Sequence, residues 1–425
     1  MAVDSAIPVS VVVASRGRPD LLVRCLTGLG QLFHEAFEIV VVADPAGMRA
    51  VTDMGWRTRV KLVAFDEANI SAARNAGIGV AAGEIVAFID DDAVPEPSWL
   101  DHLSAVFDDP QIIAAGGYVR GRNGISYQYH GALVTLAGED IALEMSGDAP
   151  FIPDPPDGHA VKTMGTNCAF RRKDVALIGG LDPVFRFFHD ETDLNMRLRK
   201  GSGRTAIVPL AQVHHGYAPS VRRGADRAPL SLFEVGASSM VFLRKHAPEG
   251  EHESALSRLR DEQRKRLLRH MVGGGLEPRD VERVMDSLDA GIAEGLRRPL
   301  SPLVPISMET APFLPFQKAQ ASRGSVCIGG RSWSRRRLHR QALAHVEAGE
   351  VVSVFRFSPT ALYHDVRFTK DGYWLQRGGL FGRANRTESV IKLTSFSARL
   401  SQEWQRVAGL RQGSGISMPR GDEEG

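Results

Sequence analysis

The sequence predicts an α/β protein built on a mostly parallel sheet that is flanked by helices. Three short segments, residues 8–14, 38–43 and 84–89, have the nearly continuous Val, Ile and Ala content of strands buried on both faces. Helical stretches separate these segments, and polar residues follow each of them directly. This alternation favours a parallel sheet, and open sheets of this kind bind ligands at the carboxyl ends of their strands.

The bulk composition is that of a globular protein with room for two or three domains. The 425 residues include 52 basic and 50 acidic ones, a formal net charge of +2, which gives no support for nucleic acid as a partner. The 3 cysteines are far apart in the sequence, so they predict no disulfide framework and no zinc cluster and fit a cytoplasmic protein. No segment approaches the roughly 18 apolar residues that cross a bilayer, so we expect a soluble protein, or one peripheral to the inner face of the cell membrane.

The first strand leads into a polar loop, Ser15 to Arg18, and then into a helix, because Pro19 suits a first helical turn. The second strand ends at Asp44, and residues 60–65 predict a third strand. Residues 69–79 have the small side chains of a helix packed closely on the sheet.

The fourth strand, residues 84–89, ends in Asp90, Asp91 and Asp92. Three adjacent carboxylates repel one another, and a cation compensates this repulsion. Mg²⁺ and Mn²⁺ prefer one or two carboxylates together with phosphate oxygens. This stretch therefore predicts a divalent metal that bridges the protein to a diphosphate.

The following 100 residues complete the predicted sheet. Residues 112–120 predict a strand, and residues 121–157, rich in Gly, Asp and Pro, predict loops and short strands over the site. Residues 185–201 predict a helix with acids at its amino end and bases at its carboxyl end, as the helix dipole favours. Residues 205–213 predict a last strand before His214 and His215.

The remainder of the chain predicts additional parts. A first domain over residues 1–230 is followed by a helical extension over 231–300, a proline-rich linker over 301–324, a small α/β accessory domain over 325–411 and a disordered tail over 412–425. The Gly329–Gly330 pair indicates a tight strand-to-helix turn, with a phosphate contact as the alternative. The basic run at 335–337 indicates a solvated helix face, with a contact to anionic membrane lipid as the alternative.

Four segments, taken together, resemble the family 2 glycosyltransferases, which have the GT-A fold. They are VVVASRGRP, ISAARNAGI, AFIDDDAVPEPSWL, and the pair GTNCAFRRKDVALIGGLDPVF and DETDLNMRL, within roughly residues 8–220. The resemblance implies a metal-dependent, inverting transfer of a sugar from a UDP-, GDP- or dTDP-sugar to a hydroxyl of a glycan or lipid-linked acceptor. It implies a role in cell-surface polysaccharide assembly, with Mn²⁺ or Mg²⁺ as the cofactor.

The resemblance also implies residue roles. Asp90 and Asp92 match the outer aspartates of the metal motif, with Asp92 as the direct metal ligand and Asp90 nearer the ribose. His214 completes the metal site, with His215 as the alternative. The catalytic base lies in DETDL, where Asp190 precedes Glu191; this order inverts the family's usual Glu-Asp, so the base stays open between them, and Glu191 is favoured by its position. The implied nucleotide-sugar contacts are Ser15, Arg16, Arg18, Asp44, Asn69, Arg74, Asn75, Asp90, Asp91, Gly165 and Asn167.

Two other functions remain open on the sequence. A catalytically inactive sugar- or nucleotide-binding scaffold is consistent with the inverted order of Asp190 and Glu191 and with a last third of the chain that has no assigned role. A nucleotidyltransferase would also use carboxylate-bound Mg²⁺ beside a parallel sheet. It predicts a glycine-rich loop with a lysine after the first strand, whereas residues 15–19 contain only Gly17 and no lysine.

Overall fold

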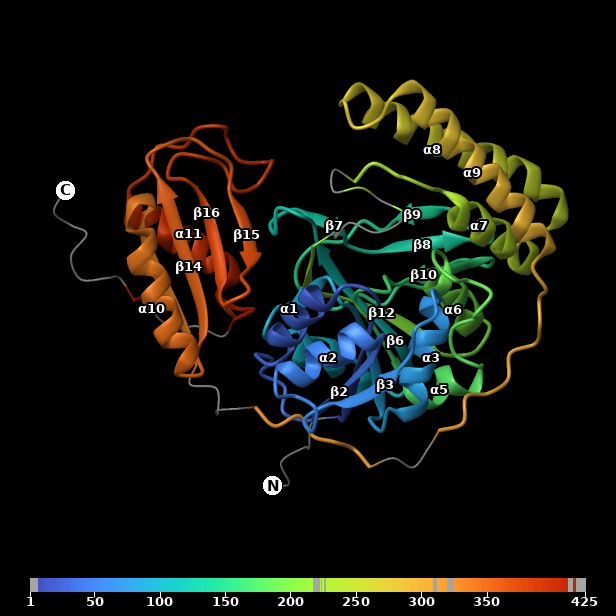
Figure 1. The fold of residues 1–425 in the computed structure, drawn as a ribbon, viewed down its shortest axis with the longest axis horizontal. Coiled ribbons are helices and arrows are strands. Elements are labelled where there is room, and N and C mark those ends of the chain that lie inside the picture. Colours follow the sequence, from blue (N-terminus) through green and yellow to red (C-terminus); the bar gives the residue numbers. More distant parts are fainter. Residues whose placement is uncertain are drawn as a thin grey trace.

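The structure is a computed structural model that describes residues 7–216, 222, 224, 227–308, 312–318, 324–411 and 416–417. A nine-stranded sheet forms the centre of the N-terminal part, together with a three-stranded sheet, and a five-stranded sheet forms a C-terminal region. Three helices, α7 (Phe233–His246), α8 (His252–Val272) and α9 (Pro278–Arg297), lie at the opposite end of the molecule from the C-terminal region (Figure 1).

The nine-stranded sheet is mostly parallel, as predicted. Its strands are β1 (Val9–Ser15), β2 (Phe37–Ala43), β3 (Lys61–Ala64), β4 (Ile85–Asp90), β5 (Ala93–Pro95), β6 (Ile112–Arg120), β7 (Tyr127–Tyr129), β11 (Cys168–Arg171) and β12 (Arg204–His215). The order is β3-β2-β1-β4-β11-β6-β12-β5, and β7 pairs with β6. Six strands run in one direction and only β5, β7 and β11 run against them, so β1, β2 and β4 end at one edge of the sheet.

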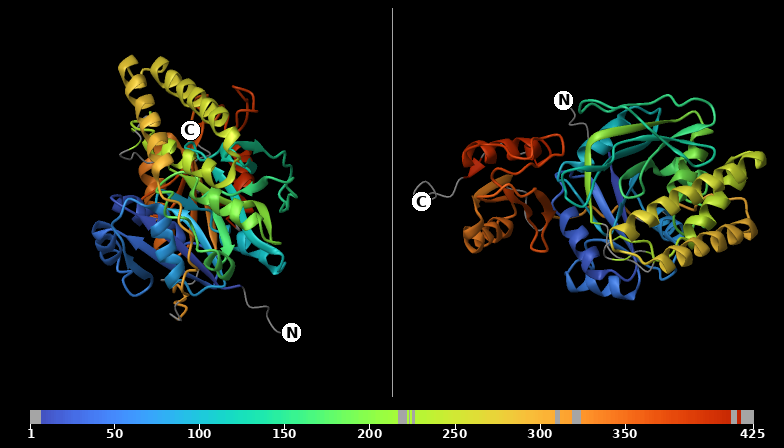
Figure 2. Two further views of the ribbon diagram at one scale, coloured as in Figure 1. Left: turned by 90° about the vertical axis from the view of Figure 1, so that its right-hand side faces the viewer. Right: turned by 90° about the horizontal axis from the view of Figure 1, so that it is seen from above.

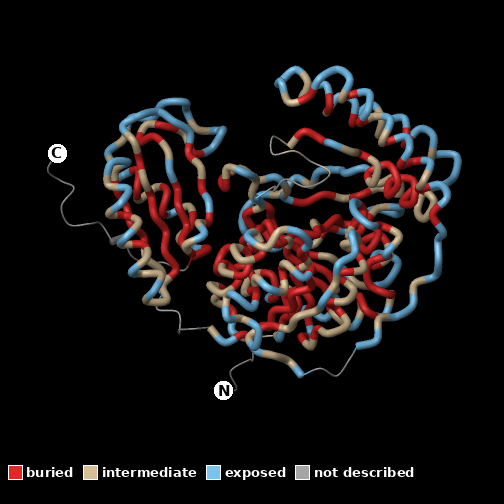
Figure 3. Tube along the Cα trace, viewed as in Figure 1, coloured by how far each residue is buried: buried red, intermediate tan, exposed pale blue. Residues whose placement is uncertain are grey.

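Helices cover both faces of this sheet. The helices on one face are α1 (Pro19–Leu29), α2 (Pro45–Asp53) and α4 (Trp99–Ala105), and those on the other are α3 (Ile70–Val80), α5 (Arg172–Leu177) and α6 (Asp190–Arg199). The buried residues concentrate between these layers (Figure 3). The small side chains predicted in α3 serve close packing, because a Cβ added to Gly77 would lie 2.4 Å from Val12 Cγ1. The predicted α/β fold class, a mostly parallel sheet flanked by helices, is therefore confirmed.

Residues 121–157 contribute loops and short strands, as expected. The three-stranded sheet consists of β8 (Ala132–Thr135), β9 (Asp140–Ala142) and β10 (His159–Lys162). Helix α7 packs on the segment that leads into α6, because Ser238 Oγ donates to Phe187 O at 2.8 Å and Lys245 Nζ donates to Asp182 at 2.5 Å.

The C-terminal region is a small α/β structure. Its elements are β13 (Ser325–Arg331), α10 (Arg335–Glu347), β14 (Val351–Ser358), β15 (Asp365–Phe368), β16 (Trp374–Gly379), α11 (Phe396–Ala408) and β17 (Ile416–Ser417). β13, α10 and β14 form the expected βαβ unit. The predicted turn at Gly329 and Gly330 is wrong, because both lie within β13, where a Cβ would lie 2.3 Å from Leu400 and 2.8 Å from Leu338. Apart from 416–417, the tail predicted over 412–425 lies outside the described residues.

The C-terminal region is packed against the N-terminal part. Buried Val94 and Ile125 of the N-terminal part share one apolar cluster with Val366, Phe368 and Trp374. Main-chain hydrogen bonds also join the two parts, from Val366 N to Asn123 O and from Ser98 N to Leu410 O. The view from above in Figure 2 shows this region beside the N-terminal sheet, away from the α8–α9 pair.

Between α9 and β13, the described residues 298–308 and 312–318 lie along the N-terminal part (Figure 1). Phe316 is 5% exposed and its ring centroid is 5.4 Å from that of Phe37 and 4.9 Å from that of Trp56. Leu314 N donates to the buried carboxylate of Glu38 at 2.8 Å. The described part of the predicted linker therefore completes the core of the N-terminal part. The domain division proposed from the sequence stays a prediction.

Candidate active site

Three potential metal ligands converge at the carboxyl end of β4. Asp90 is the last residue of β4, Asp92 follows it in the turn before β5, and His215 is the last residue of β12. One ligand atom of each lies within 4.8 Å of the other two. β5 pairs with the end of β12, so that Ala93 lies opposite His215, and this register brings the imidazole to the aspartates. Two carboxylates and an imidazole suit Mn²⁺ or Mg²⁺.

The contacts of His215 determine which ring nitrogen faces the aspartates. Its Nδ1 is 3.2 Å from Gln128 Oε1, and its Nε2 is 3.2 Å from Asp92 Oδ1. When Nδ1–H donates to the amide oxygen, Nε2 keeps its lone pair for a cation. The sequence named His214 first and His215 as the alternative, and the geometry brings His215 to this group.

Arg74 joins the metal-ligand group to α6. Its guanidinium donates to Asp90 Oδ1 at 2.9 Å, to Asp190 Oδ2 at 2.7 Å and to Gly165 O at 2.8 Å. Burial opposes the charge, but the carboxylates of Asp190 and Asp90 hold the pKa of Arg74 above its ordinary value. A Cβ on Gly165 would lie 2.6 Å from Arg74 Nη1, so glycine leaves room for this contact. Asp90 and Asp190 therefore belong to one site.

Two of the three acids in the first turn of α6 are held by cations. Asp190 binds Arg74, as described above. Asp193 accepts from Lys245 at 2.7 Å and from His246 at 2.9 Å, and it also pairs with Arg197. Burial opposes ionisation of Asp193, but these donors lower its pKa well below the ordinary value. Asp193 is therefore a fixed structural anion.

Glu191 differs from both of its acidic neighbours. It makes no ion pair with any residue that the structure describes. Burial and the negative charge of Asp190 raise its pKa above the ordinary value, although Lys162 opposes the shift. Of the acids in this turn, Glu191 is the one best suited to accept a proton near neutral pH.

Helix α6 begins at an unusual backbone turn. Phe188 and His189 both have positive φ, 70° and 64°, which side chains other than glycine adopt at a cost. The His189 ring stacks on Phe242 of α7 with centroids 4.8 Å apart. Packing by α7 therefore stabilises the backbone that places Asp190 and Glu191 at the start of α6.

The loop after β1 is built around Asp91 and Asp44. Asp91 is fully buried, accepts from Ser15 Oγ at 2.7 Å and lies 2.6 Å from Arg18 Nη2. Arg18 also lies 3.7 Å from Asp92 Oδ2. The Asp44 carboxylate accepts from Gly17 N at 2.9 Å and caps α2. Asp91 and Asp44 therefore shape the loop, and Arg18 is the side chain of this loop that reaches the metal-ligand group.

Several residues expected at the site have other contacts. Arg16 pairs at 2.8 Å with Asp66 on the surface, and both side chains are more than half exposed, 53% and 56%. Asn69 caps α3 by accepting from Ala72 N. Asn167 is fully buried and its amide contacts Trp99 Nε1 and the carbonyls of Tyr118 and Ala211. Asn75 bonds the main chain of Leu181. The structure therefore gives Arg16, Asn69, Asn75 and Asn167 structural contacts.

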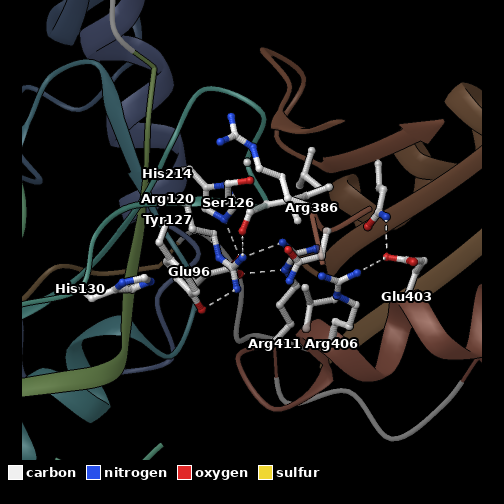
Figure 4. Close-up of a pocket in the computed structure, with 16 residues that line it drawn as sticks. Glu96, Arg120, Ser126, Tyr127, His130, His214, Arg386, Glu403, Arg406 and Arg411 are labelled. Carbon is white, nitrogen blue, oxygen red and sulfur yellow. Dashed lines mark hydrogen bonds and ion pairs between the residues drawn. The ribbon is translucent and has the colours of Figure 1, made fainter. Parts of the chain in front are cut away.

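His214 points to the other side of β12, toward the C-terminal region. Its Nε2 is 2.8 Å from Glu96 Oε1, and its ring lies 4.5 Å from that of Trp374. Arg411 binds both oxygens of Glu96, at 2.8 and 2.9 Å, and lies over Trp374. Figure 4 shows this group beside Arg120, around a cavity of about 640 Å³. Arg411 lowers the pKa of Glu96 strongly despite its burial, and burial lowers the pKa of His214 to about 4.

The sequence analysis missed Glu96, Arg411 and Gln128. Successive residues of a strand face opposite sides, so the adjacent His214 and His215 could not both reach Asp92, and this signal was available from the sequence. The contact between Glu96 and Arg411 had no such signal, because 315 residues separate the pair.

A family model and several known proteins match parts of this chain. Residues 10–177 match the model for glycosyl transferase family 2. The chain is 26% identical over 308 residues to the O-antigen biosynthesis protein RfbC of Myxococcus xanthus, which covers 62% of this chain and 24% of that protein. It is 25% identical over 241 residues to the pre-mycofactocin glycosyltransferase of Mycobacterium tuberculosis, with 53% and 47% covered. It is 27% identical over 274 residues to the succinoglycan biosynthesis protein ExoO of Rhizobium meliloti, with 59% and 72% covered.

The chain thus spans about a quarter and about half of the first two of these relatives. Among solved structures, GalNAc-T7 with UDP, GalNAc and Mn²⁺ is 15% identical with a TM-score of 0.43, covering 57% of this chain and 48% of that one. Residues 1–349 of S. aureus TarS are 17% identical with a TM-score of 0.40, covering 63% and 72%. Among the described residues, no helix has the length and apolar content needed to cross a membrane.

Proposed function

We propose that the protein is an inverting glycosyltransferase that moves a sugar from a nucleoside diphosphate to an acceptor hydroxyl, because residues 10–177 match the model for glycosyl transferase family 2. The observation that carries this proposal is Arg74, which joins Asp90 of the metal-ligand group to Asp190, the neighbour of the candidate base. One site thus offers groups for both halves of the reaction.

The first half is departure of the diphosphate. We propose that Asp90, Asp92 and His215 hold Mn²⁺ or Mg²⁺, which as a Lewis acid would stabilise the negative charge of the leaving diphosphate. Arg18, 3.7 Å from Asp92, is the nearby cation that can bind the same phosphates. Ser15, Asp44 and Asp91 support the loop that carries Arg18.

The second half is attack by the acceptor. We propose that Glu191 removes the proton of the acceptor hydroxyl while its oxygen bonds to the anomeric carbon and the bond from that carbon to the diphosphate breaks. A single displacement of this kind inverts the anomeric centre. Asp190 acts as a positioning residue, because Arg74 already binds it and its charge raises the proton affinity of Glu191.

The biological setting is proposed from the relatives. RfbC and ExoO carry names that refer to O-antigen and succinoglycan biosynthesis, which supports a glycan or lipid-linked acceptor in cell-surface polysaccharide assembly. All 3 cysteines are buried and free, which supports a cytoplasmic location. A peripheral contact with the membrane is a separate part of this proposal.

The test compares two variants with the wild-type chain. In Asp92→Ala we expect loss of Mn²⁺-dependent calorimetric binding of UDP, GDP or dTDP. In Glu191→Gln we expect binding to remain and turnover of the matching nucleotide sugar to fall by on the order of 10³-fold, because the base is lost. Glu67→Gln, an exposed glutamate outside the site, is the matched control and should keep the wild-type rate.

Two results would count against this assignment. If the wild-type chain with Mn²⁺ binds none of the three nucleotides, the transferase proposal fails. If it binds a nucleotide but transfers no sugar, and Glu191→Gln changes nothing, the chain is the inactive scaffold considered from the sequence.

A further inference from the structure

A strongly basic pocket lies between α1 and the C-terminal region. It has a volume of about 810 Å³, and Arg24 of α1 lines it together with side chains of α10, β14, β15, β16 and the β15–β16 turn. Its six cationic side chains are Arg24, Arg335, Arg336, Arg356, Arg367 and Lys370, and Asp371 is the single carboxylate in its lining. The whole chain has a formal charge of only +2, so this local excess is specific to the pocket.

Within the part of the chain that the structure describes, five of the six cations of this basic pocket have no anionic partner. Among the described residues, none pairs in a salt bridge or side-chain hydrogen bond with Arg335, Arg336, Arg356, Arg367 or Lys370. Burial, and then the positive charges of Arg335, Arg377 and Arg367, lower the pKa of Arg356. Like charges gathered around one cavity destabilise the fold unless an anion compensates them.

Other arginines between the C-terminal region and the N-terminal part do have carboxylate partners. Arg411, in the group around Glu96, is bound by that carboxylate, and Arg406 pairs with Glu388 and Glu403. The chain therefore does supply carboxylates to interface arginines elsewhere. In the basic pocket it supplies one carboxylate for six cations.

The pocket also offers neutral groups that can fix a small ligand. Tyr373, only 7% exposed, contacts His339 Nδ1 through its hydroxyl at 3.1 Å, and both residues line the cavity. Arg24 donates from Nη2 to the main-chain oxygen of Asp92 at 3.2 Å. The pocket is thus connected by one side chain to the turn that carries a proposed metal ligand, but it shares no lining residue with the metal-ligand group.

We propose that this basic pocket is a second binding site, for a ligand that carries clustered phosphate groups. Guanidinium groups bind phosphate oxygens in pairs, and several of them around a concave site select a compact polyanion over a single carboxylate. The ligand could be a soluble phosphorylated compound or the head group of an anionic lipid, which offer the same chemistry. This site goes beyond the proposed sugar transfer and does not depend on it.

The test uses the full chain and tripolyphosphate in a buffer with EDTA, so that no divalent metal supports binding at Asp90 and Asp92. We expect saturable calorimetric binding at about 0.1 M salt and about tenfold or greater weakening in the double variant Arg335→Gln/Arg336→Gln. Both side chains are exposed, so the variant should keep its fold, which circular dichroism and the melting temperature check.

Two controls separate this site from other causes. Arg340→Gln removes an exposed charge from the same helix outside the pocket and should leave tripolyphosphate binding unchanged. Asp92→Ala should also leave it unchanged, so failure of the sugar-transfer proposal would not affect this result. Equal affinities for the wild type and the double variant, or no binding by the wild type, would overturn the proposal.

A second arm identifies the source of the phosphate. Vesicles of phosphatidylglycerol and phosphatidylcholine are compared with vesicles of phosphatidylcholine alone by co-sedimentation. Sedimentation with the anionic vesicles that is lost in the double variant supports a lipid head group. Tripolyphosphate binding without sedimentation supports a soluble phosphorylated ligand.

Discussion

The two faces of the β5–β12 edge carry similar acidic and histidine side chains, but these side chains have different partners. On one face, Asp90, Asp92 and His215 bring their ligand atoms within 4.8 Å of one another. On the other, Glu96 and His214 lie 2.8 Å apart, and Arg411 neutralises the carboxylate. Each face combines acid and imidazole groups, but only the second receives an arginine from the C-terminal region.

The difference shows how one segment can serve chemistry and assembly together. Seven consecutive positions, from Asp90 to Glu96, supply carboxylates to both faces. The adjacent His214 and His215 of β12 turn to opposite faces because successive residues of a strand alternate in direction. The face that receives Arg411 joins the two parts of the molecule. On the other face, Asp90 binds Arg74 of the N-terminal part, and Asp90, Asp92 and His215 stay close enough to share a cation. A carboxylate beside a histidine is therefore not enough to identify a metal site; the cation already present must be considered.

Removal of Arg411 should give the largest effect on this comparison. Arg411→Ala leaves Glu96 buried without its cation, so we expect the free energy of unfolding to fall by about 3–5 kcal/mol. Urea denaturation measures this change. Arg406→Ala is the matched control: the Arg406 side chain is 29% exposed and its buried partner Glu403 keeps Arg399 as a second cation, so we expect a loss of less than about 1 kcal/mol.

The reason for the loss can be tested in the same background. Glu96→Gln added to Arg411→Ala removes the unpaired charge and should recover part of the stability. Equal losses in Arg411→Ala and Arg406→Ala would show that the Glu96–Arg411 pair has no special role in holding the two parts together.

The next largest effects should come from replacing His214 and His215 one at a time, which tests the role of each face separately. His215→Ala should weaken Mn²⁺ binding in the presence of nucleotide by on the order of 100-fold, because a proposed ligand is removed. His214→Ala should leave this affinity unchanged and lower the free energy of unfolding by about 1–3 kcal/mol, because Glu96 loses a hydrogen-bond partner. Calorimetric titration with Mn²⁺ distinguishes the two variants. Weaker Mn²⁺ binding in His214→Ala, with unchanged binding in His215→Ala, would contradict the assignment of the metal to the face that carries His215.

The smallest expected effect concerns pH and two glutamates. Arg411 lowers the pKa of Glu96, so its stabilising contribution is present above the ordinary glutamate pKa and is lost only as the pH falls toward the lowered value. Glu191 has a raised pKa, so as the proposed base it ionises at a higher pH than usual and kcat should rise with pH across that range.

Asp190→Asn sharpens this prediction. Removal of the neighbouring negative charge should lower the pKa of Glu191 and shift the acidic limb of the pH–rate profile to lower pH. A profile that does not move in this variant would contradict the assignment of Glu191 as the base.

The sequence was sufficient for features that local patterns determine. Buried apolar strands, the helix of small residues around Gly77 and the charge distribution of α6 all follow from periodicity and dipole arguments, and the sheet and helices agree with them. The aspartates at the end of β4 were expected at the ligand-binding edge of the sheet, because open parallel sheets bind ligands at the carboxyl ends of their strands.

Contacts between distant parts could not be predicted in this way. Asn167 was expected to contact the nucleotide sugar, yet its side-chain amide bonds Trp99 and two main-chain carbonyls in the interior. The three acids Asp190, Glu191 and Asp193 differ in their ion-pair partners. Those partners are Arg74 and residues of α7, which no local pattern places beside α6. Such partners arise from tertiary packing, which overrides local preference.

The segment between α9 and the C-terminal region limits where this chain can be shortened. Phe316 fills a gap between Phe37 and Trp56, and Leu314 gives Glu38 one of its hydrogen bonds. A chain cut after residue 300 would expose these aromatic rings to water and promote aggregation. The smallest autonomous version of the N-terminal part should therefore extend through Lys318, beyond the boundaries at residues 230 and 300 that the sequence predicts.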